Sequence, residues 1–167
     1  MILLIREITE VDAAPFLQLC QTIDQETNFM LFEPNERNFT IEKQTSMIQA
    51  LLSPHNSTLL VAEKDEQLVG YIIARGGAVR RKQHAAYLVI GVLQQYAGQG
   101  IGKRLLQEIE QWARTQQLLR LELTVMSHNE RAIALYKKIG FAIEGEAVHG
   151  LIVDGQPRNE YYMAKIL

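Results

Sequence analysis

A glycine-rich turn between an apolar run and a helical pattern constrains this chain more than any other feature. Residues 87–93 read YLVIGVL, and residues 95–102 that follow read QYAGQGIG. A strand, a glycine turn and a helix start together place several backbone N–H groups around one point, and those amides lack helical partners. The helix dipole adds positive potential there. We therefore predict a binding site for phosphate oxygens at this turn.

Two familiar phosphate-binding motifs do not fit the turn. The glycines at 98, 100 and 102 are spaced G-x-G-x-G, whereas the dinucleotide fingerprint needs G-x-G-x-x-G and usually follows the first strand. A P-loop ending at Gly102-Lys103 needs Gly at position 97 and Ser or Thr at position 104, which are Ala97 and Arg104 here. A tight turn without a ligand is the remaining alternative.

Length and composition are those of one soluble globular domain, which we expect to span residues 1–167. The net charge of −2 argues against nucleic acid as a partner. Cys20 cannot form an internal disulfide, and its apolar context predicts a buried thiol rather than a nucleophile. The N-terminus becomes charged too early for a signal peptide, and no apolar run is long enough to span a membrane. We expect a cytoplasmic protein with no membrane partner.

Hydrophobic periodicity and turn signals predict a mixed sheet with helices on its faces. The expected strands are 2–8, 58–63, 68–74, 84–93, 119–125, a long strand from Phe141, and a last strand to about 166 after the turn at 154–155; the expected helices are 11–25, 40–53, one from 101, and one ending at Gly140. The order βααβββαβαββ contains one βαβ crossover, from 84–93 to 119–125. Those two strands are predicted to be parallel.

Three local patterns refine these boundaries. Thr9 and Asp12 have the spacing of a helix-capping pair, and Ser127 with Glu130 forms the pattern of a capping box. Between 119 and 125 the residues alternate, so Leu119 and the three apolar residues at 121, 123 and 125 should share one face.

The glycine turn and a second motif downstream resemble those of the GNAT superfamily of acyl-CoA-dependent N-acetyltransferases. Residues 95–100 (QYAGQG) match the family signature Q/R-x-x-G-x-G/A, and residues 129–141 (NERAIALYKKIGF) match N-x-x-A-x-x-L-Y-x-K-x-G-F. The element order agrees across nearly the whole chain. Many relatives have Pro at the position of Gln94 and Arg at that of Ala97, and the loss of the arginine is expected to weaken pyrophosphate binding.

The resemblance implies a fold and a donor. The fold would be a single GNAT domain of the α/β (mixed α+β) class. Its central sheet of about seven strands would be mixed and mostly antiparallel, with one parallel, splayed pair and about four flanking helices. The donor would be acetyl-CoA, without a metal. The residues implied to hold it are Ile90 and Val92 for the pantetheine arm, the amides of Gly98, Gly100, Ile101 and Gly102 for the pyrophosphate, and Gln95 and Gln99 close by.

The resemblance also implies the reaction, in which an acetyl group moves to a primary amine by direct attack in a ternary complex. A backbone N–H near Val92 would stabilise the developing oxyanion. Tyr136 occupies the family position that donates a proton or hydrogen bond to the leaving thiolate; a core aromatic is the alternative. Asn129 would either bind the pantetheine arm or only cap the helix that follows.

The general base and the acceptor are less constrained. Glu122 is a candidate base on the polar face of its strand, and an ion pair with Arg120 is the alternative. Glu26, Phe29 and Glu33 are candidates for binding the acceptor, which would be a polyamine, an amino acid, a drug or a protein N-terminus. A homodimer through the C-terminal strands is compatible with the resemblance. A module that senses acyl-CoA without turnover, and a transferase with a longer acyl donor, are the competing functions.

Overall fold

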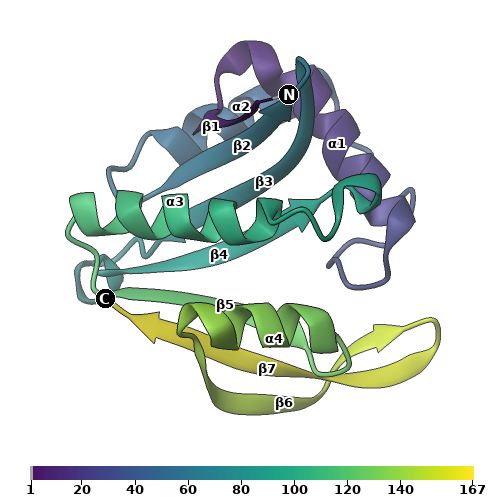
Figure 1. The fold of residues 1–167 in the computed structure, drawn as a ribbon, viewed down its shortest axis with the longest axis vertical. Helices are drawn as coiled ribbons and strands as arrows, with labels where there is room; N and C mark the ends of the chain where they lie inside the picture. Colours follow the sequence, from purple (N-terminus) through teal and green to yellow (C-terminus); the bar gives the residue numbers. More distant parts are fainter. Residues whose placement is uncertain (1) are drawn as a thin grey trace.

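The computed structural model of the protein describes residues 2–167, which form one sheet flanked by helices (Figure 1). The strands are β1 (Leu3–Glu7), β2 (Thr58–Lys64), β3 (Gln67–Gly76), β4 (Ala85–Val92), β5 (Arg120–Met126), β6 (Ala142–Val153) and β7 (Gln156–Ile166). The α-helices are α1 (Ala13–Glu26), α2 (Ile41–Leu52), α3 (Ile101–Thr115) and α4 (Glu130–Ile139). Three short 3-10 turns are η1 (Glu10–Asp12), η2 (Arg80–Lys82) and η3 (Gln94–Tyr96).

The strands are ordered β1-β2-β3-β4-β5-β7-β6 across the sheet. Every neighbouring pair is antiparallel except β4 and β5, which are parallel. This parallel pair is joined by α3, as the crossover pattern predicted. The expected fold class, a mostly antiparallel mixed sheet with one parallel pair, is therefore confirmed.

The parallel pair splays apart. β4 and β5 are in register only from Ala85 to Tyr87 on one strand and from Arg120 to Glu122 on the other. Beyond this point the two strands diverge toward their C-terminal ends, as Figure 1 shows. At the point of divergence the Tyr87 hydroxyl lies 2.6 Å from Thr124 Oγ1 and bridges the two strands. The C-terminal half of β4 therefore has an edge that β5 does not cover.

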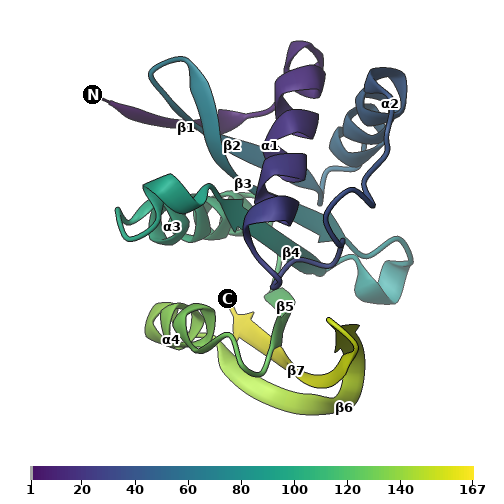
Figure 2. The ribbon, with the colours of Figure 1, turned by 90° about the vertical axis from the view of Figure 1, so that its right-hand side faces the viewer.

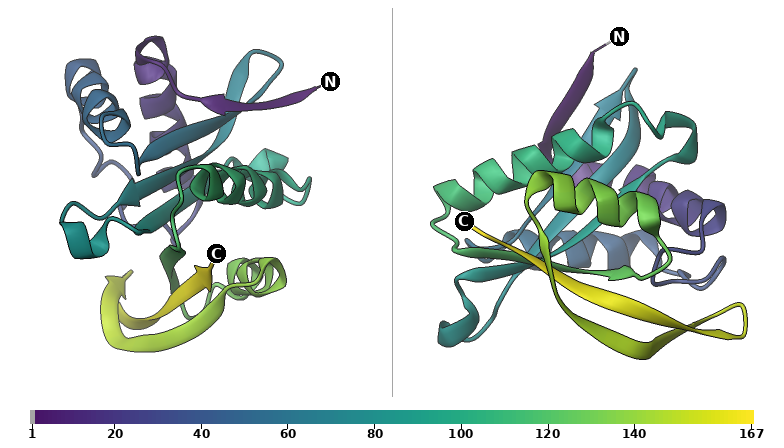
Figure 3. Two further views of the ribbon diagram at one scale, coloured as in Figure 1. Left: turned by 90° about the vertical axis from the view of Figure 1, so that its left-hand side faces the viewer. Right: turned by 60° about the horizontal axis from the view of Figure 1, so that its bottom comes forward.

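The helices cover both faces of the sheet, α1 and α2 on one and α3 and α4 on the other (Figures 2 and 3). Two glycines show which elements approach each face. A Cβ atom at Gly91 of β4 would be 3.1 Å from Ile23 of α1, whereas one at Gly70 of β3 would be 3.4 Å from Leu105 of α3. The main core lies between these layers and includes the fully buried Tyr71.

Helix α3 follows directly from the glycine turn and is amphipathic. Its buried residues are Ile101, Leu105, Leu106, Ile109 and Ala113. This spacing places an apolar stripe on one side of the helix, and burial of that stripe against β2, β3 and β4 fixes how the helix leaves the turn. The packing of α3 thus holds its N-terminus at the C-terminal end of β4.

Of the three local patterns in the sequence, one predicted the structure correctly and two did not. The pairing of Thr9 with Asp12 is confirmed, because the Asp12 carboxylate accepts a 2.8 Å hydrogen bond from Thr9 N. The prediction that Leu119 shares a strand face with residues 121, 123 and 125 is wrong, since Leu119 precedes β5 and is 58% exposed, whereas those three residues are buried. The capping box at Ser127 is also wrong: α4 begins after Asn129, whose Oδ1 accepts a hydrogen bond from Ala132 N at 3.3 Å. Within residues 2–167, no helix is both long and apolar enough to cross a lipid bilayer.

Candidate functional site

The glycine turn lies at the C-terminal end of β4 and has a left-handed backbone at two positions. Gly98 has φ +77° and Gly100, the N-cap of α3, has φ +81°. Glycine adopts this region without the steric cost that a Cβ atom brings. The two glycines therefore let the backbone turn sharply between β4 and α3.

The amides of this turn are free to bind a ligand. Within residues 2–167, the amides of Gly98, Gln99 and Gly100 donate no hydrogen bond. The first backbone bond of α3 runs from Arg104 N to Gly100 O, so the amides of the first helical turn also lack partners. An array of unpaired N–H groups at a helix N-terminus suits phosphate oxygens, as predicted from the sequence.

Two cations from other elements flank the turn. Lys64, at the end of β2, donates a 3.2 Å hydrogen bond from Nζ to Gln99 Oε1. Arg131, in the first turn of α4, lies beside Gly98: a Cβ atom at Gly98 would be only 3.2 Å from its Nη2. Sequence reasoning missed both, and for Lys64 no sequence signal exists. Arg131 belongs to the downstream motif, but only the packing of α4 reveals that it lies beside the turn where Ala97 replaces an arginine.

The uncovered edge of β4 presents the backbone of Ile90 and Val92. Leu93 N donates to Val69 O of β3, so the alternation of the strand directs the N–H and C=O groups of residues 90 and 92 away from β3. These groups face the gap where β5 has diverged. Their position is compatible with pairing to an extended ligand, as the resemblance implied.

Tyr136 lies on α4 and is buried, with 8% of its surface exposed. Its ring packs at a tilt against Phe141, with the centroids 6.0 Å apart. Burial raises the pKa of Tyr136 to about 12, with a smaller contribution from the nearby Tyr87. The phenol therefore stays protonated across the neutral range and can act as a hydrogen-bond donor.

Asn129 and Glu122 have roles in the fold that the sequence had left open. Asn129 caps α4 through its side chain. Glu122 accepts a 2.8 Å hydrogen bond from Arg120 Nε, and Arg120 also pairs with Glu144. Glu122 is opposite Tyr87 in the last pair of the β4–β5 register, where the two strands part. This ion pair is the alternative that the sequence left open, and the geometry does not favour Glu122 as a general base.

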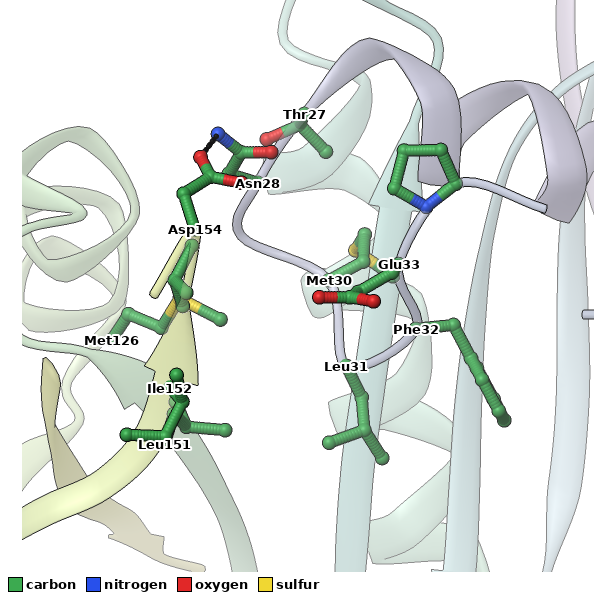
Figure 4. A pocket seen from close by; sticks show the side chains of 12 residues that line it. Thr27, Asn28, Met30, Leu31, Phe32, Glu33, Met126, Leu151, Ile152 and Asp154 are labelled. Carbon is green, nitrogen blue, oxygen red and sulfur yellow. Dashed lines mark hydrogen bonds between the residues drawn. The ribbon is translucent and has the colours of Figure 1, made fainter. Parts of the chain in front are cut away.

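A cavity of about 290 Å³ lies between the α1–α2 connection and the tip of the β6–β7 hairpin, and both segments line it. In Figure 4, side chains from the two segments face each other across it. Of the three residues predicted to bind the acceptor, only Glu33 lines this cavity. Phe29 packs against His128, with ring centroids 5.0 Å apart, and Glu26 accepts a 2.8 Å hydrogen bond from Gln94 N. Glu26 thus links the end of α1 to the segment that begins the glycine turn.

Other reactive groups do not add to this site. Residues 2–167 contain no cluster of three or more His, Cys, Asp or Glu side chains that would hold a metal ion. Cys20 is buried, and burial raises the pKa of its thiol to about 12, so it is the inert core thiol that the sequence predicted.

Known proteins resemble this chain in sequence and in fold. Residues 21–141 match the model of the acetyltransferase (GNAT) family. The L-amino acid N-acetyltransferase AaaT of Escherichia coli K12 is 33% identical over 111 residues, which are 64% of this chain and 67% of AaaT. A GNAT acetyltransferase structure from Streptococcus pneumoniae is 30% identical with a TM-score of 0.96, over 99% of this chain and 100% of that one. YncA of Salmonella typhimurium, solved with its cofactor acetyl-CoA, has a TM-score of 0.87 at 18% identity, over 99% and 94% of the two chains.

These matches define the family but not the acceptor. The alignments with the first three curated relatives span between 38% and 67% of those proteins' own lengths. The family match covers more than half of this chain, and the Streptococcus pneumoniae structure matches nearly all of it. On these grounds the chain belongs to the GNAT family of acyl-CoA-dependent acetyltransferases.

Proposed function

We propose that this protein transfers the acetyl group of acetyl-CoA to a primary amine by direct attack in a ternary complex. The observation that carries the proposal is the set of free amides at the glycine turn, next to the uncovered edge of β4. A phosphate-binding turn and an open strand edge in this arrangement suit a ligand that has a diphosphate at one end and an extended amide-bearing arm at the other.

The residues present fit acetyl-CoA. Gly100 has no atom within 4 Å of the position of a Cβ, so the space beside its backbone is open to a ligand. Lys64 and Arg131 supply positive charge next to Gln99 and Gly98 of the turn. The pyrophosphate would lie on the amides of Gly98 to Gly102, and the pantetheine arm along Ile90 and Val92. Acetyl-CoA would supply the activated acetyl group.

The chain's own residues would orient the reactants and handle charge. The N–H of Val92 is a donor for the negative charge that develops on the carbonyl oxygen. The Tyr136 hydroxyl is a neutral donor toward the sulfur. In the balanced reaction an ammonium loses two protons and its nitrogen forms a bond to the acetyl carbon as the C–S bond breaks. One proton ends on the thiol and the other in solvent.

The test is calorimetric titration of the full chain with acetyl-CoA, combined with an assay for thiol release in the presence of amines. Gly100→Glu places a carboxylate where the pyrophosphate would lie, and we expect it to weaken acetyl-CoA binding by at least about 100-fold, or 2.7 kcal/mol. Gly155→Glu is the matched control, because Gly155 has a similar φ of +75° and equally open space but lies at the tip of the β6–β7 hairpin.

Each outcome decides between the competing functions. One-site binding that Gly100→Glu abolishes and Gly155→Glu retains, with thiol release, supports the transferase. Binding without thiol release for any amine would instead favour a module that senses acyl-CoA. No binding of acetyl-CoA by the folded protein would overturn the proposal.

A further inference from the structure

The cavity beside the splayed strands has two walls, which come from segments far apart in the sequence. One wall comes from the connection after α1 and the other from the end of β5 and the tip of the β6–β7 hairpin (Figure 4). The side chains that line it are Thr27, Asn28, Met30, Leu31, Phe32, Glu33, Pro34, Met126, Leu151, Ile152, Val153 and Asp154. Because Met126 ends β5, the cavity adjoins the gap between the two diverging strands, where the acetyl group would lie under the proposed function.

Charge in this cavity has one sign. Glu33 and Asp154 are the charged residues of the lining, and within residues 2–167 no Lys, Arg or His lines it. The Glu33 carboxylate has no ion-pair partner among the described residues. Asp154 Oδ2 accepts a 2.9 Å hydrogen bond from Asn28 Nδ2, a neutral partner that leaves the charge of the carboxylate uncompensated.

Arg37 is the cation beside this wall, and its charge is already paired with a carboxylate. Arg37 stacks on the Phe32 ring, with Cζ 4.4 Å from the ring centroid. Its Nε lies 2.8 Å from Oδ2 of the buried Asp24. Phe32 lines the cavity and Arg37 does not, so the guanidinium is engaged with Asp24 and is not presented to the cavity.

The remaining lining is mostly aliphatic, aromatic or thioether. Met30, Leu31 and Phe32 line one wall, and Leu151 and Ile152 line the other (Figure 4). Such walls favour an apolar group through burial of its surface. Two carboxylates favour an ammonium, and they oppose a second carboxylate because like charges at a recognition site are repelled.

We infer that the acceptor is a primary amine on an apolar carrier with no free carboxylate next to the amine. A peptide whose first residue is apolar and a simple alkylamine both have this chemistry, whereas a free amino acid does not. The inference rests on the proposed function, because it names the acceptor class of the same transferase site.

The experiment compares acceptors that differ in one group. With saturating acetyl-CoA, thiol release is measured for L-leucine, L-leucinamide, isopentylamine and a leucyl-glycyl-glycine peptide. Isopentylamine lacks the carboxylate of leucine but keeps its side chain and a strongly basic amine, so it controls for the lower amine pKa of leucinamide. We expect kcat/KM to be at least about tenfold higher for the three acceptors without an adjacent carboxylate than for leucine. The ratio of kcat/KM for the peptide and for isopentylamine then shows whether the acceptor is a peptide N-terminus or a simple alkylamine.

Two further comparisons test the charge and the walls separately. Glu33→Gln should raise KM for leucinamide and lower the preference for leucinamide over leucine by at least about threefold, a readout that a purely structural role of Glu33 would not move. Glycinamide should be at least about tenfold poorer than leucinamide, because it lacks the apolar side chain. Calorimetric affinity for acetyl-CoA should be unchanged in Glu33→Gln.

The outcomes separate this inference from the proposed function. If the protein binds acetyl-CoA but uses leucine as well as leucinamide and isopentylamine, or uses none of the apolar amines, the acceptor inference is overturned while the donor site stands. If the folded protein does not bind acetyl-CoA, the proposed function fails and the inference fails with it.

Discussion

Tyr136 combines deep burial with a raised pKa, and together these limit what its hydroxyl can do. A thiol has a pKa of about 8.5, so full transfer of a proton from a group with a pKa of about 12 to a thiolate costs about 5 kcal/mol. The pKa of an unperturbed tyrosine, about 10, already lies above that of the thiol, and burial of Tyr136 widens this gap. Hydrogen bonding to the developing negative charge on sulfur is therefore the favoured role.

Tyr136→Phe removes that donor and keeps the ring that packs against Phe141. We expect kcat to fall by about 100-fold, with the calorimetric affinity for acetyl-CoA unchanged, because the bond matters only as charge develops. Tyr162→Phe is the matched control, since Tyr162 is half exposed on β7. An unchanged kcat in folded Tyr136→Phe would show that Tyr136 serves only the core.

Arg131 is the second residue with a specific expectation. Its guanidinium lies beside Gly98, where it can offset the missing arginine at position 97. Arg131→Gln should weaken acetyl-CoA binding by about tenfold, or 1.4 kcal/mol, and the difference from wild type should shrink as salt is added. Lys137→Gln, which removes an exposed cation further along α4, should bind acetyl-CoA as the wild type does. Equal affinities for the two variants would exclude Arg131 from the donor site.

At the scale of elements, the divergence of β4 and β5 creates both binding regions. The uncovered edge of β4 faces the donor site, and the end of β5 contributes Met126 to the acceptor cavity. The Tyr87–Thr124 hydrogen bond lies where the strands part and is their one side-chain hydrogen bond within residues 2–167. It follows the last backbone pair and fixes where the opening begins.

A double-mutant cycle measures this bridge. Tyr87→Phe and Thr124→Val should each lower the free energy of unfolding by about 1 kcal/mol, as expected for one hydrogen bond between half-buried groups. Because both remove the same bond, the double variant should lose less than the sum of the single losses. Urea unfolding gives the three values, and strictly additive losses would mean that the two hydroxyls do not stabilise each other.

The same scale shows why some boundaries could be predicted and others could not. The alternation from 119 to 125 and the 3.6-residue stripe of α3 are properties of contiguous residues. The helix formed from residue 101 as expected, and the strand formed one residue later than expected, from Arg120 to Met126. Leu119 continued the alternation but lies outside the strand, because the register with β4 begins at Arg120. Asn129 and Ser127 are both residue types that favour the N-cap position. The chain enters α4 only after residue 129, so the N-cap is Asn129.

For the whole molecule, the ion pair between Arg6 and Asp12 connects the edge strand β1 to the start of α1. The Asp12 carboxylate accepts bonds of 2.8 and 2.9 Å from the Arg6 guanidinium, together with one from Thr9 N. The bond to Arg6 is the largest cause of the lowering of the pKa of Asp12 from 3.8 to about 2. A lowered folded-state pKa contributes stability that is present above the unfolded pKa and is lost as the pH falls through the folded one.

Asp12→Asn should therefore lower the free energy of unfolding by about 2 kcal/mol at pH 7, the value of a shift of nearly two pKa units. The gap between wild type and variant should narrow as the pH falls from about 4 to about 2. Urea unfolding across this range tests the expectation, with Glu108→Gln, which removes an exposed carboxylate of α3, as the control. A gap that does not depend on pH would show that the charge of Asp12 does not contribute.

The sequence by itself determined the features that depend on neighbours along the chain. The positive φ of Gly98 and Gly100, the helix start after them and the order of strands and helices follow from local sterics and periodicity, and two spaced motifs identified the family. Only the tertiary structure placed Arg131 beside Gly98, bound Glu26 to Gln94 N, and opposed Glu33 to Asp154 across a cavity. The residues of these three pairs are from 33 to 121 positions apart in the sequence. Strand register and helix packing decide them, and periodicity carries no information about either.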